Sequence, residues 1–254
     1  MTPFLLALLA AAPAPAAPPL PTTKTCIDLV RAAPDRAVAV ADGWRAKGGG
    51  LDAMQCGALA LSALERWSEA GVAFEATALE ATRVQDLRAA DYWVQAGNAW
   101  LAGGDAAKAK KDFDTALAST TLAPKLRGEA HLDRARAAVA AGDAAAARSD
   151  IDQALTLVTA DPFAWYLSAA LARRQNDLPR AKTDIAKALT LAPEDAQLLL
   201  EAGNVSGAAG DTEGARTYFA RAAKAAPTSE PGRAAAAALA ANTEPAAPAA
   251  APPR

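Results

Sequence analysis

Four near-copies of one fifteen-residue segment lie between residues 103 and 223. The segment "GGDAAKAKKDFDTAL" at 103–117 is followed by "AGDAAAARSDIDQAL" at 141–155, "QNDLPRAKTDIAKAL" at 175–189 and "AGDTEGARTYFARAA" at 209–223. Their Gly-Asp or Asn-Asp steps are 38, 34 and 34 residues apart. A nearly constant period in this range is typical of solenoids, in which each unit buries its apolar face against its neighbours. The repetition therefore favours an array of small units over one large core.

Each copy has the residues of a helix-turn-helix. The Gly or Asn of the step tolerates the left-handed backbone that ends a helix, and the Asp can accept a free N–H of the next helix. The step is followed by an alanine, a bulky residue and another alanine, at spacings of four and three that share one helix face. These positions are Ala109, Phe113 and Ala116; Ala147, Ile151 and Ala154; Ala181, Ile185 and Ala188; and Ala215, Phe219 and Ala222. We expect the alanines to let helices approach closely around the bulky residue.

The composition agrees with thin, closely packed helices. Hydrophobic residues make up 52% of the chain but aromatic residues only 5%, because alanine supplies most of the apolar content. Alanine is the best helix former and buries little area. The net charge of −2 predicts neither a nucleic-acid partner nor a polybasic membrane contact.

The N-terminal residues suggest export. An apolar run at 4–12 is shorter than the roughly 20 residues that span a bilayer, and small residues and prolines follow it. This pattern predicts a signal peptide at 1–17, cleaved near Ala16, and a linker at 18–24. The mature protein would then be periplasmic or secreted, without stable membrane insertion. The alternative is an Ala/Pro-rich leader that is disordered.

Two cysteines, Cys26 and Cys56, stand outside the repeated segments. In an oxidising compartment an isolated pair is a candidate disulfide, which the predicted export favours. In the cytosol the two would be small buried thiols.

In the helical segments, the pattern resembles the tetratricopeptide repeat, a 34-residue helix-turn-helix. The matching residues of two units are Trp93, Gly97, Trp100, Gly104, Ala109, Phe113 and Ala116, and Leu199, Gly203, Gly210, Ala215, Phe219, Ala222 and Pro227. The unit at 128 departs from the motif, with His131 in the first large position and Thr159 in place of proline. The resemblance implies an all-α, right-handed α-solenoid with helical caps, of the exported bacterial type.

The register of the motif divides the chain into units. We expect a degenerate helical cap at 25–50, broken at Pro34, a degenerate repeat at 51–89, a repeat with an insertion at 90–127, repeats at 128–161, 162–195 and 196–229, a capping helix at 230–241, and a disordered Pro/Ala-rich tail at 242–254.

No residue pattern points to catalysis. His131, the single histidine, falls in a packing position that faces its own second helix. The acidic pairs Asp112/Asp114 and Asp150/Asp152 recur with the repeat, and we expect them on the convex, solvated side. General acid–base chemistry needs a pocket as well as two carboxylates. We therefore expect no enzyme, and no catalytic, cofactor-binding or metal-binding residue.

The resemblance implies that the first helices of the units line a groove that binds a protein or peptide. The groove candidates are Asn98, Glu129, Arg136, Phe163, Tyr166, Arg173 and Asn204. Aromatic and arginine residues are the commonest binding hot spots, although Phe163 could instead pack against the neighbouring unit. The alternatives are a scaffold of an envelope complex that acts through its convex face or tail, and a regulatory subunit of an enzyme.

Overall fold

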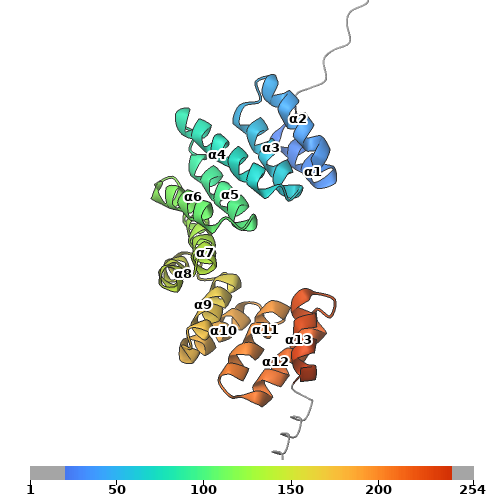
Figure 1. Cartoon of the computed structure of the whole chain (residues 1–254), viewed down its shortest axis with the longest axis vertical. Coiled ribbons are helices and arrows are strands. Elements are labelled where there is room, and N and C mark those ends of the chain that lie inside the picture. Colours follow the sequence, from blue (N-terminus) through green and yellow to red (C-terminus); the bar gives the residue numbers. More distant parts are fainter. Residues whose placement is uncertain (1–20, 242–254) are drawn as a thin grey trace, which may run out of the picture.

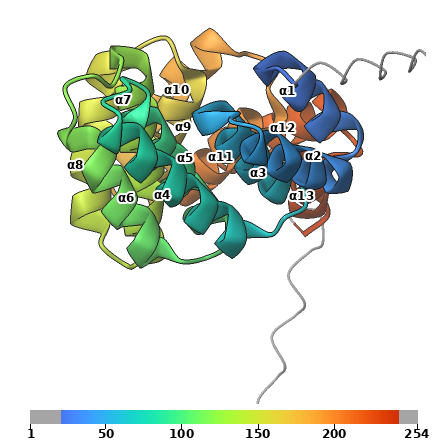
Figure 2. The ribbon, with the colours of Figure 1, turned by 90° about the horizontal axis from the view of Figure 1, so that it is seen from above.

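The computed structural model describes residues 21–241, so the predicted signal peptide at 1–17 and the tail at 242–254 lie outside the described residues. Within 21–241 the chain is all α-helical, with thirteen helices. Successive helices pack as antiparallel neighbours along a curved rod, with α1 to α3 at one end and α11 to α13 at the other (Figure 1). Seen along the rod, the helices follow a coil (Figure 2).

The helices alternate with short turns. Their bounds are α1 Thr23–Ala32, α2 Pro34–Ala46, α3 Gly50–Ala63, α4 Trp67–Arg83, α5 Ala89–Ala102, α6 Ala106–Ala118, α7 Pro124–Ala140, α8 Ala144–Leu157, α9 Pro162–Arg174, α10 Leu178–Leu191, α11 Ala196–Ala208, α12 Thr212–Ala225 and α13 Glu230–Ala241. The pairs α3/α4 through α11/α12 are helical hairpins, and α13 closes the array against α12 and α11. No helix within 21–241 is both long and apolar enough to cross a membrane.

The repeated steps are the turns inside four of these hairpins. Gly104, Gly142 and Gly210 have φ values of 82°, 80° and 78°, and Asn176 has 60°. The Asp that follows each of them is the N-cap of the second helix. For example, the carboxylate of Asp143 accepts the N–H of Ala146 at 2.9 Å. The left-handed residue and the acidic cap together fix where one helix stops and the next starts.

The repeated small and bulky residues form the core. The alanines of the sequence register are buried, and Phe113 is completely buried between α5 and α6. Gly97 lets the two helices approach so closely that a Cβ atom at its position would lie 2.7 Å from the Phe113 ring. The glycine of the motif is therefore required by the packing of its own hairpin.

A disulfide fastens the N-terminal end of the rod. Cys26 of α1 is bonded to Cys56 of α3, with their Cα atoms 5.8 Å apart. Cys26 is the one fully buried residue of α1, and it packs with Trp44 of α2. The chain break predicted at Pro34 is the first turn of α2.

The four extra residues of the 38-residue interval lie at the start of a helix, inside the unit expected at 90–127. The predicted boundary between residues 127 and 128 falls inside α7, which has 17 residues where α9 and α11 have 13. Four residues make about one helical turn, so the insertion lengthens α7 and leaves its facing residues near their register. Arg127 in this extra turn donates to the carbonyl oxygens of Leu117 and Ser119, closing the end of α6.

Candidate functional site

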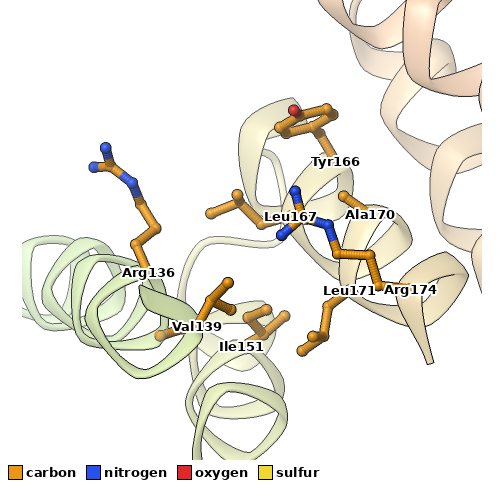
Figure 3. Close-up of a pocket in the computed structure, with 9 residues that line it drawn as sticks. Arg136, Val139, Ile151, Tyr166, Leu167, Ala170, Leu171 and Arg174 are labelled. Carbon is orange, nitrogen blue, oxygen red and sulfur yellow. The ribbon is translucent and has the colours of Figure 1, made fainter. Parts of the chain in front are cut away.

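A pocket opens between the first helices α7 and α9. Its volume is about 160 Å³, and its lining residues are Ala135, Arg136, Val139, Ile151, Tyr166, Leu167, Ala170, Leu171 and Arg174. Ile151 reaches it from α8, so the bulky residue of the repeat supplies part of the floor (Figure 3). The floor is apolar, because Ile151 and Leu171 are buried and Val139 and Leu167 pack against the same cluster.

Two stacked aromatic rings belong to the α9 side of the pocket. The ring centroids of Phe163 and Tyr166 lie 5.6 Å apart, with planes inclined by 25°. Tyr166 lines the pocket, while Phe163 lies one turn earlier on α9 and is 38% exposed. Phe163 therefore makes an exposed ring contact within its own helix. Stacked aromatic rings are rigid and offer contact area at low entropic cost.

Two guanidinium groups stand at the pocket and differ in their partners. Arg136 of α7 donates to Asp133 on the same helix at 3.0 Å, and its head group points away from the floor (Figure 3). Burial raises the pKa of Asp133, and this is partly offset by Arg136 and by the Asn98 amide. The Arg174 guanidinium lies over the pocket and has no ion pair within residues 21–241.

The remaining groove candidates lie in two other places. On the α5/α7 side, Asn98 lies near Asp133 and acts to lower the pKa of its carboxyl group, and Glu129 lies 3.6 Å from the Lys125 ammonium. On the α9/α11 side, Arg173 donates to both carboxylate oxygens of buried Glu201, at 2.7 and 3.2 Å, and Asn204 donates to Glu201 at 3.3 Å. The pocket thus gathers Arg136 and Tyr166 with Phe163 beside them, and Arg173 ties α9 to α11.

Sequence reasoning missed Arg174, Leu167 and Leu171 as pocket residues. The doublet Arg173–Arg174 at the end of α9 was the available signal, since one guanidinium faces α11 and the other the pocket. The arginine that faces α11 is determined by the position of Glu201, which lies 28 residues from Arg173 in the chain.

The recurring aspartates are buried, so the expectation of a solvated convex position is wrong for the first residue of each pair. Asp150 and Asp184 bond the first helix of their own hairpin, and the residues they bond there also contact the preceding unit, which makes these positions joints between helices. Asp112, Asp150 and Asp184 share one register position on α6, α8 and α10, and all three are buried. The sequence pattern alone resembles a surface charge, because the partners lie on other helices.

The joint at Asp150 is fully paired. Asp150 accepts from Arg134 of α7 at 2.6 and 2.9 Å, and His131 Nδ1 lies 2.9 Å from the same carboxylate. Arg134 also donates to Asp114 of α6 at 2.7 Å. These contacts lower the pKa of Asp150 against the effect of its burial, which acts in the opposite direction. His131 thus joins α7 to its own second helix α8, in the predicted packing position.

The two other joints carry different side chains. At Asp184, Ser168 of α9 donates to the carboxylate and accepts from Arg148 of α8 at 2.9 Å. At Asp112, neither carboxylate oxygen has a hydrogen-bond partner within 21–241. Burial raises the pKa of Asp112 to about 7, and the nearby Glu75 carboxylate adds to the increase. Glu75 itself accepts from the Trp100 indole at 2.9 Å.

Comparison with known proteins shows the fold. No family model and no curated protein matches the sequence. A solved structure described as PilF of Pseudomonas aeruginosa matches with a TM-score of 0.68 and 15% identity, over 85% of this chain and 95% of that one. The fold is that of a tetratricopeptide-repeat solenoid.

Two further solved structures share this fold. PilW, described as a type IV pilus biogenesis factor, matches with a TM-score of 0.68 and 20% identity, over 84% of this chain and 95% of that one. YrrB, described as a tetratricopeptide-repeat protein with an unusual peptide-binding site, matches with a TM-score of 0.55 and 16% identity, over 85% of this chain and 100% of that one. Identities this low show similarity of fold alone.

Proposed function

We propose that the protein is a non-catalytic adaptor that holds a protein or peptide segment in the groove formed by its first helices, with the α7/α9 pocket as the anchor point. The fold is one that typically serves as a protein-binding scaffold. The observation that carries the proposal is an apolar, partly open pocket between the first helices α7 and α9 (Figure 3). Concave apolar sites with a few convergent polar groups are the usual form of binding sites.

The proposed location is the periplasm or the outside of a bacterial cell. The disulfide between Cys26 and Cys56 supports it, because such bonds persist in oxidising compartments. The similarity to PilF and PilW agrees with an envelope role. The predicted signal peptide lies outside the described residues.

Site-specific photo-crosslinking in intact cells tests the groove. The crosslinking amino acid p-benzoylphenylalanine would replace exposed Phe163 beside the pocket, because it conserves an aromatic ring there. Matched controls would replace Leu79 of α4 and Arg216 of α12, which are exposed on second helices. We expect one dominant adduct at position 163, unchanged when residues 242–254 are deleted. Adducts at the control positions alone would show that the groove is not the binding surface. Loss of the adduct at position 163 on deletion of the tail would show that binding depends on the tail.

One observation favours the scaffold alternative on the opposite side. Val72 and Leu79 of α4 are 57% and 60% exposed. Leu79 lines a shallow hollow with Arg45, Met54 and Ala76, and these last three residues also line a second, adjoining hollow. Exposed apolar surface of this kind often marks an interaction site. A dominant adduct at position 79 would make this hollow the binding surface.

A further inference from the structure

The size of the α7/α9 pocket limits what can enter it. An apolar cavity of about 150 Å³ accommodates one benzene molecule, whereas pockets for whole small ligands span about 300–1,000 Å³. With about 160 Å³, this pocket has room for a single large side chain. Its floor of Val139, Ile151 and Leu171 would accept a phenyl or isobutyl group and would leave a polar group without hydrogen-bond partners.

The positive charge of Arg174 over the pocket limits which residue can stand next to the bound side chain in the partner segment. Arg174 presents its guanidinium over the apolar floor, and no carboxylate pairs with it within 21–241 (Figure 3). The adjacent Arg173 shows the contrast, since its guanidinium is engaged by both oxygens of Glu201. A guanidinium and a carboxylate form strong, often bidentate hydrogen bonds, and removal from water strengthens them further. The guanidinium of Arg136, on the other side of the pocket, is already paired with Asp133, so among the described residues Arg174 carries the unpaired charge at this pocket.

We infer that the pocket binds a partner segment in which a phenylalanine or leucine is adjacent to an aspartate or glutamate. The apolar side chain enters the cavity between α7 and α9, and the neighbouring carboxylate pairs with Arg174. The ring pair of Phe163 and Tyr166 borders the segment on the α9 side. This inference rests on the proposed function and adds the chemistry of the partner to it.

A peptide selection tests the inference without knowledge of the natural partner. Random twelve-residue peptides, displayed inside a phage coat protein so that no free C-terminal carboxylate is present, would be selected on the full chain and on Arg174→Glu. We expect the full chain to enrich Phe or Leu next to Asp or Glu. Charge reversal should replace the acidic residue by Lys or Arg. Arg216→Glu, the same charge change on α12, is the matched control and should keep the acidic preference.

An enriched peptide, acetylated and amidated, would then be titrated by fluorescence anisotropy. We expect Arg174→Ala to weaken binding at least about tenfold, and Ala170→Leu, which narrows the pocket, to weaken it similarly, with unchanged circular dichroism. Peptides that bind the pocket without an acidic residue would overturn the inference and leave the proposed function standing. If no enriched peptide were sensitive to Ala170→Leu, the groove itself would be the wrong site.

Arg173 is unsuitable for this test, although the sequence placed it in the groove. Its removal would leave the buried Glu201 carboxylate without its guanidinium, which destabilises the fold. Loss of binding in Arg173→Ala would therefore not distinguish recognition from unfolding. Arg174 has no such structural role among the described residues, and its replacement is expected to leave stability nearly unchanged.

Discussion

Asp112, Asp150 and Asp184 show how one register position acquires different chemistry from its neighbours. The position that holds Arg134 in α7 holds Ser168 in α9 and Ala96 in α5. From the first helix Asp150 therefore has a guanidinium and Asp184 a hydroxyl, while Asp112 faces Glu75 and the Trp100 indole. Asp184 also accepts from Arg180 of its own helix at 3.3 Å. Lys111 on the same helix is the cation that acts on Asp112, and it only partly offsets the burial. An isolated buried carboxyl group favours its neutral form.

Because the carboxyl group of Asp112 is buried without a hydrogen-bond partner among the described residues, we expect the free energy of unfolding to fall as the pH rises. The pKa of Asp112 is about 7 in the folded chain and about 3.8 without the fold, so the folded state binds the proton more tightly. Its stabilising contribution is fully present below pH 4 and is lost as the pH rises through about 7. From pH 5 to pH 8 we expect the free energy of unfolding to fall by about 2–3 kcal/mol, measured by urea denaturation.

Asp112→Asn should remove most of this fall, because the amide does not titrate. The raised pKa values of Asp91 and Asp133 act in the same direction and remain. Asp114→Asn on the same helix is the matched control and should retain it. The lowered pKa values of Asp86 and Asp150 act with the opposite sign, since they add stability that is lost only on acidification below about pH 4. A stability of Asp112→Asn that still fell by the full amount between pH 5 and pH 8 would show that another group is responsible.

At the scale of the element, the hairpins depend on glycines that lie under aromatic rings. Gly97 faces Phe113, and Gly203 faces Phe219 in the same way three units later. In each case a first helix approaches its second helix to a distance that excludes a methyl group. The aromatic ring at the bulky position fills the space that the absent side chain leaves, so the two residues form one packing unit.

This arrangement predicts opposite effects of one substitution at two glycines. Gly97→Ala should lower the free energy of unfolding by about 1–3 kcal/mol, because the new Cβ overlaps the Phe113 ring. Gly207→Ala should raise it by about 0.5–1 kcal/mol, because its Cβ would meet only Ala215 at 3.8 Å and alanine is the better helix former. Thermal unfolding followed at 222 nm compares the two. A destabilised Gly207→Ala would contradict the packing argument.

At the scale of the whole molecule, each helix pair contacts mainly its neighbours along the rod. Stability in such an array is nearly a sum over units and their interfaces, so a local loss stays local. The N-terminal end is the weakest point of attachment, because α1 buries one residue fully, and that residue is the disulfide-bonded Cys26. The bond closes a loop across 30 residues, which corresponds to about 3–4 kcal/mol in the chain-entropy model.

Reduction of the disulfide is therefore expected to loosen one end of the rod only. Hydrogen exchange measured by mass spectrometry should show faster exchange in α1 and α2 and unchanged protection in α9 to α12. The double variant Cys26→Ser with Cys56→Ser should behave like the reduced chain and should not respond to reductant. Uniformly faster exchange through α12 would instead show that the cap supports the entire array.

Much of this fold is predictable from the sequence because its determinants are local. Turn residues, N-caps and the alanine–bulky–alanine spacing each lie within one hairpin, so their register sets the helix pairs. The pocket and the polar joints are less predictable, because they depend on contacts between helices. Arg173 pairs with Glu201 of another helix, and Arg134 pairs with Asp150 of another helix. The predicted unit boundary after residue 127 falls inside α7 for a related reason. Four residues can lengthen a loop or a helix, and Arg127, which binds the end of α6, has no counterpart in the motif.

The joints also give the array an order. Packing residues are nearly interchangeable from unit to unit, but each polar joint matches one pair of neighbours. If the units containing α7/α8 and α9/α10 were exchanged, Ser168 would take the place of Arg134 beside Asp114, and Arg134 would meet the position of Ala186. Arg134 would keep Asp150 of its own hairpin. Arg148, which has two further buried nitrogens without partners within 21–241, would lose Ser168. A buried charge that loses a partner is costly. The units of such a repeat protein are therefore not interchangeable, because the polar contacts between neighbouring units fix the order in which they stack.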